Sequence, residues 1–305
     1  MSNRKFVIAD VFTEKIFGGN QLAVFTDGVG LDAQTMQKIA REMHFSETTF
    51  LFPPEQGGDF KVRIFTPEHE LPFAGHPVVG TAHVIVAERM KQSTEPVTAV
   101  TLETGVGPLL VEVNIENGHA GHTVMNQPLP VVKGTFSEVA AMAKALSLDA
   151  SEIEQTGLPI EIIYNGITMM VVPVASREAI ERIKVDSGAL EQISKDASAE
   201  TVLTFTRETI SPSSHVHCRV FAPAAGVAED AATGSANGAF SSYLVRHRVV
   251  DVQPLTTILS EQGFEMNRPS LLHLEVRVDA KTNEVKGVRV GGGVVISGRG
   301  EIILS

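Results

Sequence analysis

Cysteine, tryptophan and long apolar runs are nearly absent from this sequence. Its 305 residues include one cysteine, Cys218, no tryptophan and 6% aromatic residues. A single cysteine excludes an intrachain disulfide and is compatible with a reducing compartment, so we expect a cytoplasmic protein. No apolar run approaches the roughly 20 residues that span a bilayer, and Met1–Phe6 lacks the apolar core of a signal peptide. We therefore expect no membrane association.

Positive charge is also scarce. Lysine and arginine together number 25 against 36 aspartates and glutamates, which gives a formal net charge of −11. Without basic clusters, a phosphate backbone or an anionic membrane surface would be repelled, so nucleic acid is not an expected partner. A small molecule is the expected partner. The length and the 43% hydrophobic content are sufficient for two domains with their own cores.

A repeated pattern divides the sequence into two halves. Arg63–Pro67 with Gly75-His76-Pro77 resembles Arg219–Pro223 with Gly234-Ser235-Ala236, at nearly constant offsets (219 − 63 = 156; 234 − 75 = 159). The same order is kept by three further pairs: Asp32–Ala40 with Asp186–Ser194, Glu47-Thr48 with Glu200-Thr201, and Leu102–Gly105 with Ser260–Gly263. This shared order indicates a tandem duplication.

Short β-branched and aromatic runs predict strands at residues 6–12, 22–25, 49–52, 60–65, 97–102 and 109–115. Apolar spacing predicts helices at Asp32–Met43, with Asp32 as N-cap, and at Pro77–Met90. The second helix is apolar around most of its circumference, and its counterpart, Ala236–Val245, is rich in small residues. Both should therefore be enclosed by strands. The predicted fold class is α+β, with two similar domains that are each a curved, mostly antiparallel sheet or barrel around a central helix.

The domain boundary is expected near Met125–Pro130, where Asn126–Pro130 interrupts regular structure. The first domain would then cover residues 1–127 and the second residues 128–289. The end of the chain, about residues 290–305, contains Gly298–Leu304, which has no counterpart after Val124. We expect this segment to return and pair with the first domain.

The two predicted helix starts are the most specific chemical signal. Gly75 and Gly234 allow close backbone approach, and Pro77 suits the first helical position. Free N–H groups at such starts bind carboxylates or phosphates. If a pseudo-twofold axis brings both starts to one cleft, they would hold an anionic ligand there. The alternative is a pair of ordinary capped helices, with Ser235 as a cap.

Four ionisable side chains could add acid-base chemistry. His76 lies in the first start, and Glu229-Asp230 lies beside the second, so an imidazole and a carboxylate could relay a proton or hold an amine. Glu47 precedes an apolar strand, and apolar surroundings would raise its pKa towards a value suited to proton exchange. The alternatives are a histidine bonded to backbone and a solvated glutamate at a strand edge.

Other histidines give weaker signals. His215 and His217, next to Cys218, alternate along a predicted strand as metal ligands can, but no paired acidic or histidine motif lies nearby, so no metal is assigned. His69, His76 and His83 are spaced by seven residues, and Pro72 and Pro77 are expected to interrupt any helix that would align them.

A set of motifs extends over nearly the whole chain. It comprises Gly19-Asn20, Ile39–Met43 with Ser46-Glu47-Thr48, Arg63–Pro67 with Leu71–Pro77, Gly226–Ala236, and Gly298-Arg299-Gly300. With these motifs the sequence resembles the PhzF family of phenazine biosynthesis, which shares its fold with diaminopimelate epimerase. The resemblance implies an isomerase without metal or cofactor, usually a homodimer, with barrel-like domains around central helices and an active site between them.

The resemblance also implies roles for individual residues. Glu47 would be the general acid/base, with His76, Asp230 and Ser235 completing the catalytic set. The residues that bind substrate or shape the site would be Asn20, Ser46, Gly75 and Gly234. Many relatives have proline where this chain has Ala231, and the phenazine-pathway members resemble this chain there.

Two positions bear on the type of reaction. Related epimerases and racemases use two thiols at the glycine turns, and the corresponding residues here are Ala74 and Thr233, neither of which is a base near neutral pH. One carboxylate that moves a hydrogen within a small cyclic amino acid fits better, and the expected substrate is trans-2,3-dihydro-3-hydroxyanthranilate. The alternatives are an amino-acid epimerase or racemase and a non-catalytic small-molecule binding protein.

Overall fold

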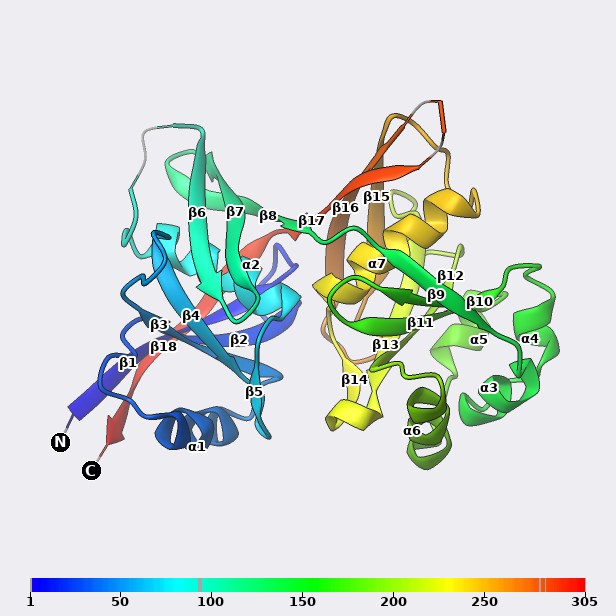
Figure 1. Cartoon of the computed structure of the whole chain (residues 1–305), viewed down its shortest axis with the longest axis horizontal. Helices are drawn as coiled ribbons and strands as arrows, with labels where there is room; N and C mark the ends of the chain where they lie inside the picture. The colour runs from blue at the N-terminus through cyan, green and yellow to red at the C-terminus, as the bar shows by residue number, and fades with distance from the viewer. Residues whose placement is uncertain (1, 93–94, 280, 283, 305) are drawn as a thin grey trace. The chain divides into compact units, whose positions relative to one another are not determined.

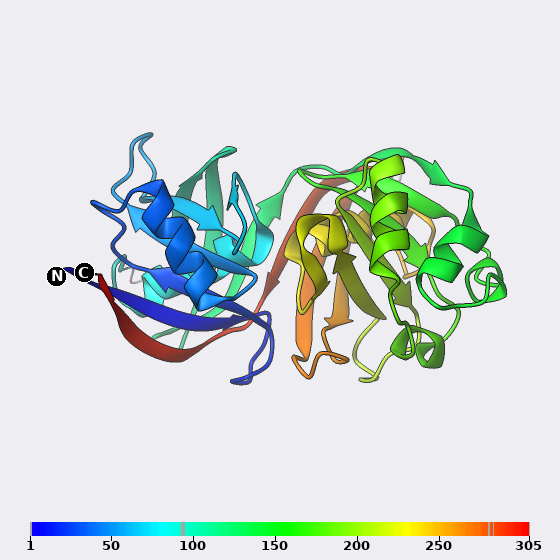
Figure 2. The same cartoon turned by 90° about the horizontal axis from the view of Figure 1, so that it is seen from below.

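The first and last strands of the chain lie side by side. In the computed structural model, which describes residues 2–92, 95–279, 281–282 and 284–304, β1 (Ser2–Val11) pairs antiparallel with β18 (Val294–Leu304) and with β2 (Asn20–Phe25). Both termini therefore belong to one unit, Met1–Asn126 with Gly291–Ser305, and a second unit spans Gln127–Val290 (Figures 1 and 2).

The strands of the first unit continue from β2 with mixed polarity. They are β3 (Glu47–Phe52), β4 (Phe60–Phe65), β5 (Glu70–Leu71), β6 (Val97–Thr104), β7 (Gly107–Glu116) and β8 (His119–Gln127), of which only Gln127 lies in the second unit. The β2–β3 and β4–β6 pairs are parallel, whereas β3–β4, β6–β7 and β7–β8 are antiparallel. In both parallel pairs a helix lies between the two strands in the sequence, because parallel strands need a long crossover connection.

The strands of this unit surround α2 (Gly75–Ala87). The helix contacts β1, β2, β3, β6, β7 and β18, and every residue from Gly75 to Ile85 is buried. Gly80 shows how closely the strands approach, because a Cβ atom there would lie 2.6 Å from Leu22 Cδ2. A helix that is apolar all round is stable only in such an enclosure.

Helix α1 (Ala33–Met43) covers the opposite face of this sheet. Asp32 caps it as expected, since its Oδ1 accepts a hydrogen bond from Thr35 N at 2.7 Å. Below the helix, Phe50 stacks on Phe25 with ring centroids 4.9 Å apart and meets Phe65 edge-on at 5.6 Å. The helix and this aromatic row form a core separate from that around α2.

The second unit has the same plan with more helices outside. Its strands are β9 (Val131–Phe136), β10 (Ile160–Tyr164), β11 (Thr168–Pro173), β12 (Thr201–Thr206), β13 (Val216–Ala222), β14 (Val227–Asp230), β15 (Leu255–Gln262), β16 (Ser270–Val278) and β17 (Val285–Gly292), of which the last two residues lie in the first unit. Its helices are α3 (Val139–Ala145), α4 (Ser151–Glu154), α5 (Arg177–Glu181), α6 (Ser187–Asp196), the 3₁₀ turn η1 (Pro223–Ala225) and α7 (Gly234–Arg246).

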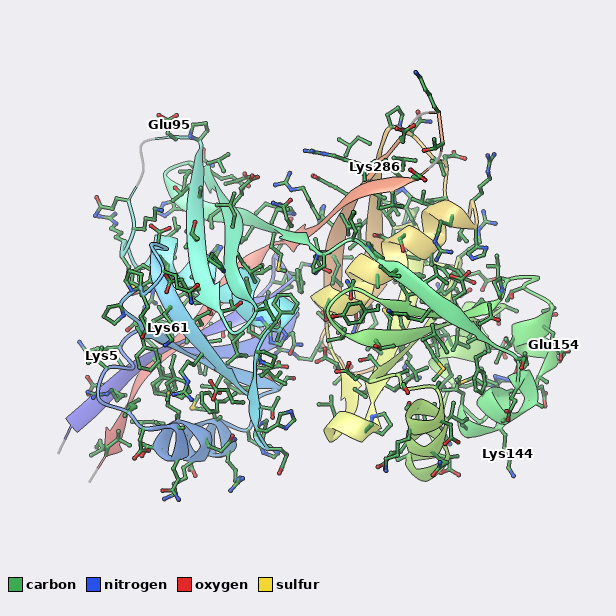
Figure 3. All side chains as sticks on the ribbon, in the orientation of Figure 1. Lys5, Lys61, Glu95, Lys144, Glu154 and Lys286 are labelled. Atoms are coloured by element: carbon green, nitrogen blue, oxygen red, sulfur yellow. The ribbon has the colours of Figure 1, made fainter. Side chains whose placement is uncertain are left out.

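Helix α7 occupies the position of α2 in this unit. It is buried from Gly234 to Val245 and contacts β10, β11, β15 and β16. Helices α3 to α6 pack on the other face around a second apolar core, with charged side chains such as Lys144 and Glu154 directed outward (Figure 3). Each unit is thus a curved sheet with one helix inside and at least one outside, which confirms the α+β prediction.

Side-chain contacts at equivalent positions match between the units. The Arg63 guanidinium forms a two-point ion pair with Glu70 and lies 5.2 Å from the Phe65 ring centroid. In the second unit Arg219 pairs in the same way with Glu229 and lies 5.1 Å from the ring of Phe221. Contacts of this kind are what a tandem duplication predicts.

A second match involves the glutamate of the repeated E-x-G motif. Glu103 accepts hydrogen bonds from the backbone N–H groups of Glu55, Gln56 and Gly58, in the loop between β3 and β4. Glu261 accepts in the same way from Ile210 and Ser211, between β12 and β13. The two glutamates tether equivalent loops.

One sequence-based expectation about α2 is wrong. Pro77 does not interrupt the helix, because it is the third residue of α2, where its missing N–H removes no intrahelical hydrogen bond. His76 and His83 therefore lie on one helix, two turns apart, while His69 precedes β5. The described residues include no helix long and apolar enough to cross a membrane.

Candidate functional site

Glu47 and His76 meet inside the first unit. Glu47 is the first residue of β3 and His76 the second residue of α2, and their side chains approach to 3.3 Å between Oε2 and Nε2. The Glu47 side chain is 15% exposed and that of His76 4% exposed. The carboxylate therefore lies at the edge of the buried region, in contact with an imidazole and partly open to solvent.

Two polar residues extend this contact into a chain. Asn20, the first residue of β2, places its Nδ2 3.2 Å from His76 Nδ1, and its Oδ1 accepts a hydrogen bond from Ser46 Oγ at 3.3 Å. The parallel pairing of β2 with β3, in which Leu22 faces Glu47, brings these residues together. Asn20, Ser46, Glu47 and His76, all named from the sequence, thus form one cluster.

The imidazole of His76 is neutral near pH 7. Burial lowers the pKa of His76 to about 3, against a weaker opposing effect from the Gln21 backbone. The 3.3 Å approach to Glu47 is therefore a contact between a neutral ring and a carboxyl group, not an ion pair. Of the two ring nitrogens, Nδ1 faces Asn20 Nδ2 and Nε2 faces Glu47 Oε2.

The first turn of α2 presents backbone donors beside this cluster. Its N-cap residue is Ala74 in an extended conformation, and the alanine side chain provides no capping hydrogen bond. The N–H groups of Gly75 and His76 belong to the four that an α-helix leaves without an intrahelical acceptor. First-turn N–H groups of this kind can bind an anion.

The start of α7 is arranged differently. Its N-cap residue, Thr233, donates from Oγ1 to Asp230 Oδ2 at 2.6 Å, which ties the half-buried Asp230 carboxylate to the turn before the helix. Gly234 and Ser235 are the first two helical residues, and Ser235 is 6% exposed. Within the second unit, Asp230, Gly234 and Ser235 thus lie within one short turn. Glu229 is held by Arg219 instead.

Two amide side chains at this helix start were missed by sequence reasoning. Gln127 Nε2 donates to Gly234 O at 3.1 Å, and Asn165 Nδ2 donates to Ser235 O at 2.8 Å and to Gln127 Oε1 at 2.9 Å. A Cβ atom at Gly238 would lie 2.0 Å from Gln127 Oε1, so this arrangement requires glycine. For Gln127, the sequence offered one indication, which is its position in Asn126–Pro130, the segment that separates the two halves.

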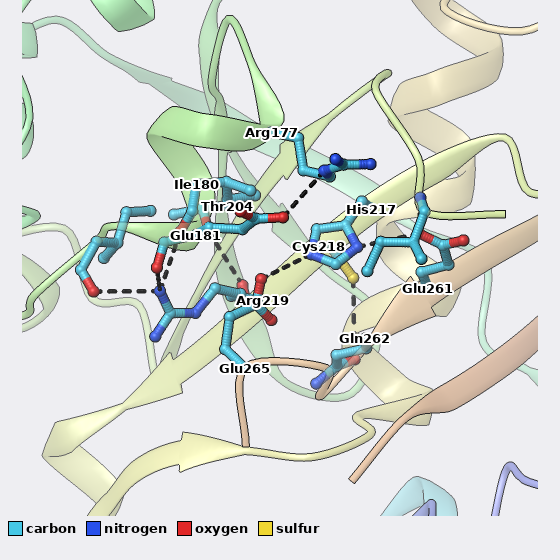
Figure 4. Close-up of polar contacts among 12 residues, drawn as sticks. Arg177, Ile180, Glu181, Thr204, His217, Cys218, Arg219, Glu261, Gln262 and Glu265 are labelled. Carbon is cyan, nitrogen blue, oxygen red and sulfur yellow. Dashed lines mark hydrogen bonds and ion pairs between the residues drawn. The ribbon is translucent and has the colours of Figure 1, made fainter. Parts of the chain in front are cut away.

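His215, His217 and Cys218 do not converge on a common point. His215 is exposed and its Nδ1 accepts from Leu259 N, whereas His217 is fully buried between Glu261 and Glu265 (Figure 4). Burial raises the pKa of the Cys218 thiol to about 12, so it is protonated near neutral pH. Among the described residues no three His, Cys, Asp or Glu side chains are placed to hold a metal ion.

Known proteins resemble this chain over its whole length. The profile of the PhzC-PhzF family, described as phenazine biosynthesis-like protein, matches residues 9–300. A trans-2,3-dihydro-3-hydroxyanthranilate isomerase of Pseudomonas fluorescens is 37% identical over 299 residues, which cover 98% of this chain and 99% of the relative. This relative has the name of the expected enzyme, so isomerase is confirmed as the reaction class.

Solved structures agree with this result. A PhzF-family protein of Bacillus anthracis superposes with a TM-score of 0.89 at 26% identity and full coverage of both chains. A "predicted epimerase" of Pseudomonas aeruginosa gives a TM-score of 0.81 at 30% identity, covering 99% of this chain and 100% of the other. The fold and the family inferred from the sequence motifs are confirmed. The chain belongs to the PhzC-PhzF family of phenazine biosynthesis-like proteins.

Proposed function

We propose that this protein isomerises a small cyclic amino acid by moving one hydrogen between two of its carbons, and that its substrate is trans-2,3-dihydro-3-hydroxyanthranilate. The observation that carries the proposal is the partly exposed Glu47 carboxyl group held 3.3 Å from a buried, neutral imidazole. The name of the Pseudomonas fluorescens relative supports the choice of substrate.

Glu47 acts as the general acid/base. Its carboxylate removes a proton from one ring carbon, the electron pair shifts along the unsaturated ring, and the same carboxyl group returns the proton to another carbon. His76 takes no net charge, because protonating a buried imidazole is unfavourable. Its Nε2, 3.3 Å from Glu47 Oε2, confines the carboxyl group, while Asn20 and Ser46 hold the ring. Substrate and product differ by one proton position, so the balance requires no oxidant or metal.

The remaining proposed site residues bind the substrate. The first-turn N–H groups next to Gly75, and those next to Gly234 in the second unit, are donors suited to anionic groups of a substrate. Asp230, whose Oδ2 accepts from Thr233, accepts from the substrate's amine or hydroxyl group. Ser235 supplies a hydroxyl group at the α7 start.

A two-base epimerase is less well supported. The two N-cap positions, where the related epimerases carry thiols, hold Ala74 and Thr233. A methyl group cannot exchange a proton, and the Thr233 hydroxyl already donates to Asp230. Glu47 is left as the base in contact with a positioned partner.

The proposal is tested by incubating the protein with trans-2,3-dihydro-3-hydroxyanthranilate in D₂O and following the ring protons by NMR. We expect isomerisation with deuterium entering one ring carbon. Glu47→Gln, which keeps the shape of the side chain, should reduce kcat by at least ~10²-fold with the melting temperature unchanged. Glu42→Gln, on the exposed side of α1, is the matched control. A Glu47→Gln variant with wild-type turnover excludes the role of Glu47.

We also propose that the two units are domains derived by tandem duplication, about residues 1–127 with the returning segment 290–305, and 128–289. The matched arginine and glutamate contacts support this. The single cysteine supports a cytoplasmic location, and the family resemblance supports a homodimer. Size-exclusion chromatography with light scattering tests the dimer, because a monomeric mass would contradict it.

A further inference from the structure

Gln262 binds both ends of the turn that precedes α7. It is the last residue of β15 and is fully buried. Its Nε2 donates to Asp230 O at 2.8 Å and to Thr233 Oγ1 at 3.1 Å. Its Oε1 accepts from Thr233 N at 3.1 Å and from Asn237 Nδ2 at 2.9 Å. One amide therefore satisfies donors and acceptors on the turn and on the first turn of the helix.

These contacts fix the direction of a hydrogen-bond chain that ends on Asp230. Gln262 donates to the Thr233 oxygen, so the hydroxyl hydrogen of Thr233 is directed to Asp230 Oδ2, 2.6 Å away. Reversing the amide would place its oxygen against Asp230 O, where two acceptors would face each other. Gln262 thus determines the direction of the hydrogen bond that Thr233 donates to Asp230.

A buried charged cluster holds the end of β15 in place. His217 lies between Glu261, which precedes Gln262, and Glu265, three residues after it, with Nδ1 3.0 Å from Glu261 Oε2 and Nε2 2.8 Å from Glu265 Oε1 (Figure 4). Burial alone would lower the pKa of His217, but these two hydrogen bonds outweigh it and raise the pKa to about 9. The imidazolium is thus charged at neutral pH and binds both carboxylates.

The backbone at this point leaves no room for adjustment. Gly263 has φ +77°, and a Cβ atom there would lie 2.4 Å from Ala231 O and 2.6 Å from Arg268 O. Ser270 Oγ donates to the same Ala231 oxygen at 2.9 Å. The turn from Asp230 to Thr233 is therefore packed tightly against the residues that follow β15, and Gln262 cannot move independently of it.

We propose that Gln262 is a positioning residue, which holds Asp230 and the first turn of α7 in the geometry that binds the substrate, and that the His217–Glu261–Glu265 cluster fixes Gln262. This rests on the proposed function, in which Asp230 and Ser235 bind the substrate. The equivalent residue of the first unit is Thr104 (262 − 158), whose Oγ1 donates to Gly107 O. The amide is therefore specific to the second unit.

The proposal is tested with Gln262→Glu, which keeps the shape and the acceptor but removes both donors. The substituted carboxylate competes with Asp230 for the Thr233 hydroxyl group and faces Asp230 O. We expect a drop in kcat/KM of about 10- to 100-fold, the usual effect of losing a supporting hydrogen bond in a site. Gln253→Glu makes the same charge change at an exposed position before β15 and should leave kcat/KM unchanged.

A pH series separates positioning from a purely structural role. The substituted carboxyl group regains a donor when protonated, so the ratio of wild-type to Gln262→Glu activity should shrink as the pH falls, in samples shown to be folded by circular dichroism. Thr233→Val removes the next link of the chain. Its effect should not add to that of Gln262→Glu, because both variants break the same connection. Full additivity, or a folded Gln262→Glu variant as active as Gln253→Glu at every pH, overturns the proposal.

Amide hydrogen exchange keeps this test independent of catalysis. Thr233 N–H donates to Gln262, so Gln262→Met should accelerate exchange at Thr233, while Gln253→Met should not. If the wild type does not convert the dihydro-hydroxyanthranilate, the proposed function fails, and exchange still decides whether Gln262 holds the turn. Unchanged exchange at Thr233 in Gln262→Met overturns the positioning role.

Discussion

The two arginine-glutamate pairs of the repeat offer a controlled comparison, because they share their geometry but differ in burial. The Arg219 side chain is 8% exposed and that of Glu229 17%, against 26% and 40% for Arg63 and Glu70. Arg219 also donates from Nη1 to the carbonyl oxygens of Ile180, Glu181 and Ile183 at 3.0, 3.4 and 3.1 Å.

Replacing each arginine with methionine should therefore have unequal effects. Arg219→Met leaves the Glu229 carboxylate and three carbonyl oxygens without their donor, and removing one partner of a buried ion pair costs about 3–5 kcal/mol. Arg63→Met breaks a pair that solvent already screens, so its cost should not exceed about 1 kcal/mol. Both variants retain an apolar side chain over the neighbouring phenylalanine, which keeps the packing comparable.

Differential scanning calorimetry measures the difference. For a unit of roughly 150–250 residues, 1 kcal/mol corresponds to about 2–4 °C, so Arg219→Met should lower the melting temperature by roughly 6–20 °C and Arg63→Met by no more than about 4 °C. Arg219→Lys should lower the melting temperature by more than Arg63→Met does, because lysine cannot reproduce the two-point ion pair with Glu229. Equal losses for the two methionine variants would refute the reasoning from burial.

Two further predictions concern pH. Burial lowers the pKa of His76 to about 3 and that of His83 to about 4, so between these values and about 6.5 the unfolded state binds more protons. Stability should therefore fall as the pH drops below about 6.5, and His83→Gln should weaken this dependence in urea titrations. His217 affects the pH dependence of stability in the opposite direction, since its pKa is raised to about 9 by Glu261 and Glu265. Its contribution is complete below about 6.5 and is lost as the pH rises towards 9, so urea titrations of His217→Gln should show a flatter alkaline limb; an unchanged limb would contradict this.

Local features of the fold could be predicted from the sequence. Asp32 accepts from Thr35 N, and Asp186 accepts from Ala189 N in the second unit, as the repeated helix-start pattern indicates. Such caps depend on residues three positions apart, so they are visible in a short window. The enclosure of α2 was visible for a similar reason, because its apolar residues cover every side of the helix.

Contacts between residues far apart in the sequence were harder to predict. The motif resemblance named Glu47 and His76, but their 3.3 Å approach depends on how β3 and α2 are placed by the sheet. The roles of Gln262 and Asn165 could not be predicted, because the sequence does not distinguish a buried glutamine or asparagine from an exposed one. Their partners lie tens of residues away and are selected by strand register, which no local pattern reports.

The tethering glutamates have a consequence for how the loops can evolve. Glu103 and Glu261 accept hydrogen bonds from main-chain amides, which nearly every amino acid supplies. Side chains in these two loops can therefore change without loss of the hydrogen bonds that hold the loops. The two loops already share little sequence, Pro53–Asp59 against Arg207–His215. New recognition elements could therefore be grafted at either location while the underlying strands remain undisturbed.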